Sequence, residues 1–249
     1  MTKVEWDYTS HAAHYDRRAD YARAAIERLL QATGCTRGTV VADVGAGTGK
    51  LTKELLALGL DVKSVEPNDA MRGFGIENTR GGTVAWSDGT GEATGLADAS
   101  VHAAFFGSSF NVVDQQACLK EVARILRPRG WFGCMWNHRE LADPIQAAIE
   151  GTIKKHIPSY DYGLRREDPT AAIARSGLFS PAQAIEQPFT WPMAREEIVD
   201  AWRSHATLRR QAATDDRFGK IIGEIEGLLT SPTIEVPYVT RIWYAQRLA

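Results

Sequence analysis

The sequence predicts an α/β fold in which a mostly parallel sheet carries helices on both faces. Three observations support this prediction. The chain has 249 residues, short apolar runs alternate with helix-like segments from Thr39 onward, and most of these runs are continuously apolar. Strands of that kind are typical of a parallel sheet buried on both sides. Because the length suffices for one well-packed domain with an elaboration, we expect a single domain spanning residues 1–249.

The first half of the chain predicts five strands. Residues 39–44 are rich in β-branched side chains and too short for a helix, whereas residues 50–58 have helical spacing and stop at Gly59. A second strand is expected at 61–66, and Asn68 is a good cap for the helix after it. Further strands are predicted at 83–86, 101–106 and 131–136, with a helix from 115 that ends in Arg-Pro-Arg-Gly.

The second half departs from this rhythm. Residues 138–180 are expected to be mostly helical, 184–191 to form a strand, and 193–230 to form two helices. Residues 236–248 alternate between apolar and polar side chains, which predicts a long edge strand. We expect this half to be an elaboration that selects the substrate, because such folds vary function through loops and insertions.

The composition argues against several classes of protein. A formal net charge of -2, with 24% charged residues, gives no reason to expect nucleic acid as a partner. No apolar block reaches the ~20 residues that span a bilayer, so we expect no membrane association and a cytoplasmic location. Cys35, Cys118 and Cys134 are widely separated, which predicts reduced, buried thiols, and His11 with His14 lacks a third ligand, so no metal is expected.

A glycine cluster follows the first strand. A triphosphate-binding loop needs a glycine five residues before Gly49 and a Ser or Thr after Lys50, but Val44 and Leu51 occupy those positions. A dinucleotide-binding loop needs a third glycine where Lys50 stands, so that interpretation is weakened.

The motifs around this cluster resemble those of class I S-adenosylmethionine-dependent methyltransferases. Residues 43–52 and 65–71 are similar to the first two motifs of that family, 87–106 to the third and fourth, and 119–132 to its helix, turn and fifth strand. Residues 14–21, 135–144 and 236–245 resemble a small-molecule subgroup related to trans-aconitate methyltransferase. The resemblance implies a Rossmann-like, seven-stranded sheet with an antiparallel last strand and a helical cap. It also implies a lead-in at 1–38 that closes over the cofactor, a cofactor-binding core at 39–137 and a substrate-side insertion at 138–249.

The family's cofactor contacts can be carried over onto matching positions. Gly45, Ala46 and Gly47 would let the backbone approach the amino-acid end of the cofactor. Asp43 would accept a hydrogen bond from the cofactor's ammonium group or, alternatively, cap the turn. Glu66 ends the second strand, where a carboxylate accepts hydrogen bonds from both ribose hydroxyls.

Further positions are implied by the same resemblance. Met71 would pack on the adenine or belong to the core, and Thr90 replaces an expected Asp, so the adenine contact would fall to the backbone or to Asp88. Arg18 would pair with the cofactor carboxylate or remain solvated. The remaining cofactor positions are Tyr15, Pro67, Gly91, Glu92, Gly107 and Ser108.

A general base is needed only if the acceptor atom carries a proton that must leave. Candidates are expected in the loop after the fifth strand, at Asn137, His138, Glu140 and Asp143. His138 would act as a base, orient the acceptor or be a solvated loop residue, and His14 is a second candidate.

These patterns predict an enzyme that transfers a methyl group from S-adenosylmethionine to an N, O or C atom of a small molecule, with specialised metabolism as one setting. The product of the cofactor would be S-adenosylhomocysteine. A nicotinamide-dependent oxidoreductase and a non-catalytic protein that binds an adenosyl ligand are the alternatives. The acceptor stays open, as does the choice between monomer and homodimer.

Overall fold

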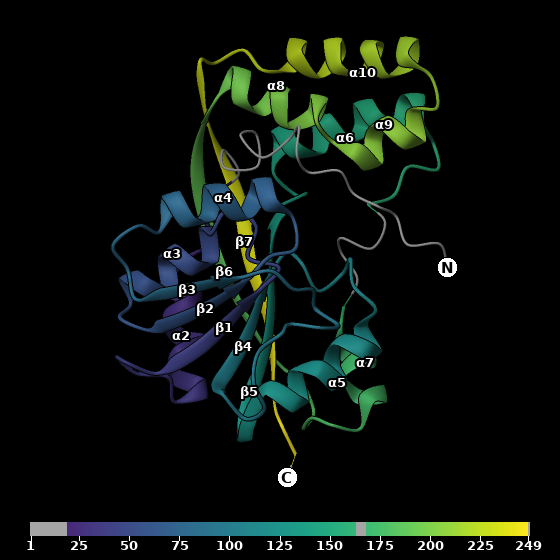
Figure 1. Cartoon of the computed structure of the whole chain (residues 1–249). Helices are drawn as coiled ribbons and strands as arrows, with labels where there is room; N and C mark the ends of the chain where they lie inside the picture. The colour runs from purple at the N-terminus through teal and green to yellow at the C-terminus, as the bar shows by residue number, and fades with distance from the viewer. Residues whose placement is uncertain (1–18, 163–167, 249) are drawn as a thin grey trace.

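The computed structural model describes residues 19–162 and 168–248 (Figure 1). In this part of the chain a seven-stranded sheet has the strand order β3-β2-β1-β4-β5-β7-β6. The first five strands run parallel, whereas β7 is antiparallel to both β5 and β6. The predicted fold class, a mostly parallel sheet with an antiparallel last strand, is confirmed.

The first half holds α2 (Arg23–Thr33), followed by the predicted elements β1 (Val40–Val44), α3 (Lys50–Ala57), β2 (Asp61–Val65), α4 (Asp69–Asn78), β3 (Val84–Ser87), β4 (Val101–Gly107), α5 (Gln115–Ile125) and β5 (Leu126–Arg139). β5 is longer than the strand predicted at 131–136, because residues 127–130, which were expected to end the preceding helix, belong to the strand. The side chain of Asn68 accepts a hydrogen bond from the backbone N–H of Met71, so it caps α4 as expected. Asp114 caps α5 in the same way.

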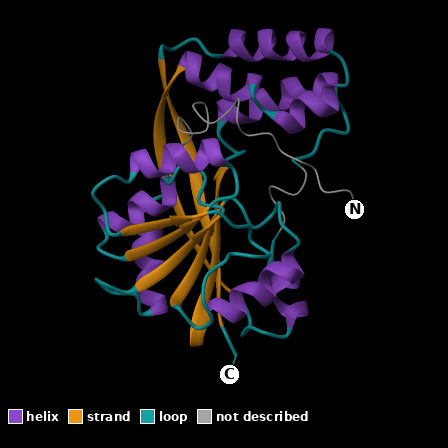
Figure 2. Ribbon diagram, viewed as in Figure 1, coloured by secondary structure: helices purple, strands orange, loops and turns teal. Residues whose placement is uncertain are grey.

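Helices cover both faces of the sheet (Figure 2). Ile26 of α2 and Leu55 of α3 are fully buried in one core cluster with Phe105 of β4. Val122 of α5 and Ile173 of α7 (Thr170–Ser176) are buried in a second cluster on Phe132. The central strands β1 and β4 are buried on two sides, which agrees with their continuously apolar sequences.

The prediction that residues 236–248 form an edge strand is wrong. β7 (Thr233–Gln246) lies between β5 and β6 (Gln183–Ala194), and β6 forms the edge. Arg241 of β7 forms an ion pair with Glu186 of β6, 3.0 Å from Nε to Oε1, and both side chains stay partly exposed. Trp243 of β7 packs edge-on against Trp136 of β5. The alternation therefore reflects side-chain pairs across neighbouring strands.

A helical cap lies beyond one end of the sheet, and β6 and β7 run out to it (Figure 1). Its helices are α6 (Pro144–His156), α8 (Arg195–Arg203), α9 (Ala206–Ala212) and α10 (Asp215–Leu228). The region 193–230 thus holds three helices where two were predicted. His205 and Thr214 each accept a hydrogen bond from a following backbone N–H, and these caps start α9 and α10. The cap has its own buried cluster, which includes Ile153, Trp202 and Ile221.

Other expectations can be compared with the described residues. Cys35, Cys118 and Cys134 are free and buried, as predicted, and burial raises the pKa of each thiol, which makes it a poor nucleophile. Within 19–162 and 168–248, no helix is long and apolar enough to cross a bilayer. The same residues contain no group of three metal-ligating side chains, and His11 and His14 lie outside them.

Candidate functional site

The turn after β1 has a backbone that favours glycine. Gly45, Gly47 and Gly49 have positive φ angles of 68°, 59° and 84°. The N–H groups of Gly45 and Ala46 donate to the carbonyl of Val65, so the turn lies on the end of β2. It also packs tightly, because a Cβ added at Gly45 would lie 2.5 Å from the Cβ of Ser109. Among the described residues, Ser109 in the loop after β4 therefore leaves no room for a side chain at Gly45.

Glu66 lies beside this turn at the end of β2. Its Oε2 accepts a hydrogen bond of 2.9 Å from the N–H of Gly47, and its Oε1 accepts one of 2.9 Å from the N–H of Asn68. The residue is buried, and burial raises the pKa of its carboxyl group. Since a carboxylate oxygen has two lone pairs, each oxygen can accept one further hydrogen bond. The carboxylate is thus fixed in place with capacity to bind a diol.

Asp43 is a second acid in the same region, and it is completely buried in β1. Its Oδ2 accepts a 2.6 Å hydrogen bond from Thr52, whose hydroxyl also contacts that of Ser64. Its Oδ1 is buried, and no group in the described part of the chain donates to it. Burial raises the pKa of Asp43 to about 7, with a smaller contribution of the same sign from Glu66. The structure therefore leaves an acceptor at Oδ1 for a donor from elsewhere.

The end of β4 is held close to this turn. Ser108 has a φ of 61°, an uncommon backbone conformation for a residue other than glycine, and its N–H donates to the carbonyl of Met135. Its hydroxyl lies 2.9 Å from that of Tyr21, which also lies close above Gly107. Ser109 donates a 2.7 Å hydrogen bond to the carbonyl of Val44. The ends of β1, β4 and β5 are therefore linked, and Tyr21 joins them, although the sequence analysis did not single it out.

Residues 19–22 lie across the same edge of the sheet. Asn137 donates hydrogen bonds to the carbonyls of Ala19 and Asp20, and Thr240 donates to Asn137 over 2.6 Å. Lys50, directly after the glycine turn, forms a 2.7 Å ion pair with Asp20. These contacts hold Ala19 and Asp20 beside the glycine turn and β5. The predicted site residues of that segment, His14, Tyr15 and Arg18, lie outside the described residues.

The predicted adenine side of the site contains both buried and exposed side chains. Met71 is buried, Pro67 is exposed, and Asp88 is exposed with a 3.7 Å ion pair to Arg72. The hydroxyl of Thr90 accepts a hydrogen bond from the N–H of Ala93, which folds the segment into a turn.

Two further residues of this segment are used in packing. Glu92 accepts a 2.9 Å hydrogen bond from the N–H of Asp114, and a Cβ added at Gly91 would meet Val113 at 3.0 Å. Both contacts attach the segment to the loop before α5. Glu92 thus already has a structural role.

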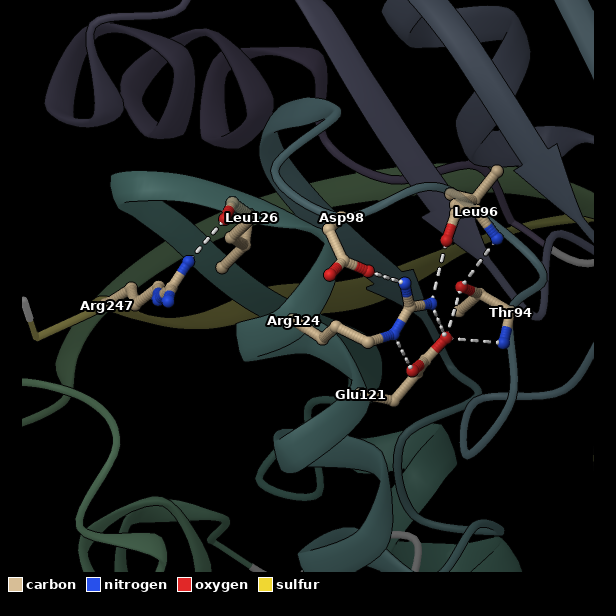
Figure 3. Close-up of polar contacts among 7 residues, drawn as sticks. All are labelled: Thr94, Leu96, Asp98, Glu121, Arg124, Leu126 and Arg247. Carbon is tan, nitrogen blue, oxygen red and sulfur yellow. Dashed lines mark hydrogen bonds and ion pairs between the residues drawn. The ribbon is translucent and has the colours of Figure 1, made fainter.

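A charged network below this segment fixes the loop between β3 and β4 (Figure 3). Glu121 of α5 accepts hydrogen bonds from the N–H and the hydroxyl of Thr94, at 2.8 and 2.6 Å. Arg124 donates to the same carboxylate, to the carbonyl of Leu96 and to Asp98. Hydrogen bonds from Arg124, followed by those from Thr94, lower the pKa of Glu121 to about 2. Arg247 donates to the carbonyl of Leu126 close by.

Glu121→Gln is expected to lower the free energy of unfolding by about 1–2 kcal/mol at pH 7. The effect is no larger because Arg124 is partly exposed and solvent screens its ion pair with Glu121. Because the native pKa lies below the unfolded value, this contribution is present above about pH 4.5 and is lost as the pH falls toward 2. Urea unfolding should show that the difference in unfolding free energy between the wild type and Glu121→Gln is smaller at pH 3 than at pH 7. Glu77→Gln, which removes an exposed pair with Arg80, should change little. An equal difference at both pH values would contradict the assignment of the lowered pKa to Glu121.

The candidate bases are not arranged as predicted. Asn137 and His138 lie within β5 and pair with Thr240 and Val239 of β7, rather than in a loop. The prediction failed because the pairing strand lies about a hundred residues later in the sequence. His138 is a buried strand residue, so the solvated-loop interpretation is wrong.

The other two candidates have structural roles. The carboxylate of Asp143 caps α6 by accepting hydrogen bonds from the N–H groups of Ile145 and Gln146. Glu140 is exposed and accepts a hydrogen bond from the N–H of Ala142. His138 is therefore the remaining candidate base among the described residues at this edge.

Comparisons with known proteins agree with this geometry. Residues 42–134 match the family model of a methyltransferase domain. An uncharacterized methyltransferase of Mycobacterium tuberculosis is 40% identical over 134 residues, which is 53% of this chain and 53% of that protein. A ubiquinone/menaquinone biosynthesis C-methyltransferase of a Caulobacter species is 25% identical over 63% of this chain and 69% of its own length. The match to the mycobacterial relative thus spans about half of its length.

Solved structures show the fold. A protein of Anaeromyxobacter dehalogenans assigned as a type II methyltransferase has a TM-score of 0.62 at 19% identity, covering 92% of this chain and 97% of that one. The phosphoethanolamine N-methyltransferase 2 of Haemonchus contortus, solved with phosphomonomethylethanolamine and S-adenosylhomocysteine, has a TM-score of 0.57 at 11% identity and covers 97% and 58%. The glycine turn, Glu66 and Glu92 lie inside the region that matches the methyltransferase domain.

Proposed function

We propose that this protein is an S-adenosylmethionine-dependent methyltransferase that acts on a small molecule. The observation that carries the proposal is the buried carboxylate of Glu66, held against the glycine turn within the segment that matches a methyltransferase domain. A fixed carboxylate can accept hydrogen bonds from the two ribose hydroxyls of the cofactor, and a glycine turn lets the backbone approach the cofactor closely.

The described residues fit this cofactor. Glu66 would accept the ribose hydroxyls, the open Oδ1 of Asp43 would accept from the ammonium, and Gly45 and Gly47 would face the amino-acid end. When bound, S-adenosylmethionine supplies a methyl group already activated by a sulfonium charge. The protein's contribution is then largely alignment and exclusion of water, and alignment can lower a barrier by ~7 to 11 kcal/mol.

The helical cap is the structural argument for a small-molecule acceptor. Its helices pack on a core of their own and lie beyond the sheet end that carries the site, where they can enclose a ligand. The Caulobacter relative is named for carbon methylation in quinone biosynthesis, so phenolic and quinol compounds belong in an acceptor screen beside amines. Specialised metabolism and a relationship to the trans-aconitate subgroup stay hypotheses within this proposal.

Calorimetric titration with S-adenosylhomocysteine, with NAD and ATP in parallel, tests the proposal. Micromolar binding of S-adenosylhomocysteine alone is the expected result. Binding of NAD alone would favour an oxidoreductase. If S-adenosylhomocysteine binds but a broad acceptor screen with labelled methyl donor stays silent, the non-catalytic alternative gains support.

His138→Gln is expected to lower kcat by about 10²-fold or more if the acceptor atom carries a proton that must leave. S-adenosylhomocysteine affinity should be unchanged, because the loss concerns proton transfer. His102→Gln, at the amino-terminal end of β4, is the control and should retain full turnover. Full turnover of His138→Gln with saturating acceptor would remove the base assignment.

A further inference from the structure

Three fully buried polar side chains form a chain of hydrogen bonds at the end of β1. The hydroxyl oxygens of Ser64 in β2 and Thr52 in α3 lie 2.8 Å apart. Thr52 donates a 2.6 Å hydrogen bond to Oδ2 of Asp43, the residue two before the glycine turn. Since Thr52 has a single O–H and gives it to the carboxylate, its oxygen accepts the hydrogen bond from Ser64. The chain therefore runs in one direction, from Ser64 through Thr52 to Asp43.

This chain favours the ionised form of Asp43. Burial raises the pKa of the carboxyl group to about 7, because a charge is disfavoured in a buried position. The hydroxyl and the N–H of Thr52 both act in the opposite direction and lower that pKa. The hydrogen bond from Ser64 polarises the Thr52 hydroxyl, which strengthens its bond to the carboxylate. Both ionisation states are populated near neutral pH, so a change in this chain shifts the balance between them.

The elements packed around Asp43 supply one further influence on its charge. Glu66, at the end of the neighbouring β2, raises the pKa of Asp43 through its own negative charge. Lys50, at the start of α3, forms its ion pair with Asp20, and Phe105, which is paired with Asp43 across β4, is apolar. The two carboxylates thus interact across the region of the glycine turn. Because electrostatic interactions are weakly screened in a buried region, a cation bound at this turn is attracted to both carboxylates without having to touch each of them.

We propose that Thr52 and Ser64 are positioning residues that keep Asp43 ionised and thereby make the glycine turn selective for a ligand that carries an ammonium group. This inference rests on the proposed function and adds a pH dependence to the same site. A protonated Asp43 is neutral and cannot balance the ammonium charge. Binding of such a ligand therefore requires loss of the proton, so the affinity rises with pH until Asp43 is fully ionised. A ligand without an ammonium group has no such requirement.

S-adenosylhomocysteine and 5′-methylthioadenosine test the inference, because they share the adenosine and the thioether and differ in the amino-acid part. Each is titrated calorimetrically into the full-length protein at pH values from about 5.5 to 7.5. We expect the affinity for S-adenosylhomocysteine to rise about tenfold or more over this range, as follows from ionisation of Asp43, whereas that for 5′-methylthioadenosine should change much less. Titration of Glu66 affects both ligands through the ribose, so it cancels in the ratio of the two affinities.

Variants of the chain separate positioning from folding. Thr52→Val should move the rise in this affinity ratio to higher pH, and Ser64→Ala should move it in the same direction by a smaller amount. Thr52→Ser keeps a hydroxyl and should restore the wild-type profile. Thr33→Val is the matched control, because it removes a buried hydroxyl of α2 that donates to the carbonyl of Leu29, and it should leave the profile unchanged.

The outcomes distinguish this role from the proposed function. An equal pH dependence of the two ligands in the wild type would overturn the role of Asp43 ionisation. An unchanged profile in folded Thr52→Val would overturn the role of the hydroxyl chain. If S-adenosylhomocysteine does not bind at any pH, the proposed function fails. The wild-type comparison decides the role of Asp43 even if Thr52→Val does not fold, and Ser64→Ala then tests the chain.

Discussion

Glu66→Ala is expected to weaken the binding of S-adenosylhomocysteine at least tenfold. The substitution removes two acceptors for the ribose hydroxyls, and a hydrogen bond to a charged group contributes about 1.5–3 kcal/mol. It also leaves the N–H groups of Gly47 and Asn68 without their acceptor, which loosens the turn itself. Calorimetry on both proteins measures the change, and unchanged affinity would remove the ribose assignment.

A modified ligand distinguishes direct contact from a disordered turn. The 2′-deoxy analogue of S-adenosylhomocysteine should bind the wild type more weakly than the parent compound, because one hydroxyl is missing. In Glu66→Ala the two ligands should bind alike if the carboxylate contacts the ribose. Glu77→Ala, on an exposed position of α4, serves as the control and should bind both ligands like the wild type.

Asp43→Asn is expected to change how stability depends on pH. The native pKa of about 7 lies above the ordinary value of 3.8, so the folded protein binds this proton more tightly than the unfolded chain. That contribution is fully present below about pH 3.8 and is lost as the pH rises through 7. Relative to Asp43→Asn, the wild type should therefore lose roughly 2–4 kcal/mol of unfolding free energy between pH 4 and pH 8.

Urea unfolding across this range measures the difference between the two proteins. Thr52→Val removes a hydrogen bond that lowers the pKa of Asp43, so it should move the upper end of the transition to higher pH. Saturating S-adenosylhomocysteine at pH 8 should stabilise the wild type more than Asp43→Asn, because an ammonium favours the ionised carboxylate. Parallel stability curves for the two proteins would contradict the assignment of the raised pKa to Asp43.

The first half of the fold could be predicted from the sequence because its signals are local. Each parallel strand is a short apolar run, and caps such as Asn68 stand beside the helices that they start. The glycine turn and Glu66 were predicted together for the same reason, since consecutive parallel strands bring their ends to one edge of the sheet.

The remaining features depend on contacts between distant segments. β5 continues through Asn137 and His138 because β7 pairs with it, and no local pattern near residue 137 shows that partner. β7 has an alternating sequence, but it pairs with β5 on one edge and with β6 on the other, so it is not the edge strand. The start of α10 could have been found, because Thr214 followed by two aspartates is a typical helix beginning. The stacking of Arg139, at the end of β5, on Trp202 of α8 had no such signal, because about sixty residues separate the two side chains.

The unbroken β6–β7 ribbon limits how this protein can be altered in length. From Gln183 to Ala194, β6 pairs residue by residue with β7, so the same two strands belong to the sheet and to the cap. Thr240 anchors residues 19–22 on one face of β7, and Trp243 packs on the other. Inserting one residue into β7 between the cap and Thr240 would move the side chains on one side of the insertion to the opposite face of the strand. A matched insertion of two residues in each strand would keep every side chain on its present face. Exchange of the cap with that of a relative therefore requires ribbons that differ by an even number of residues.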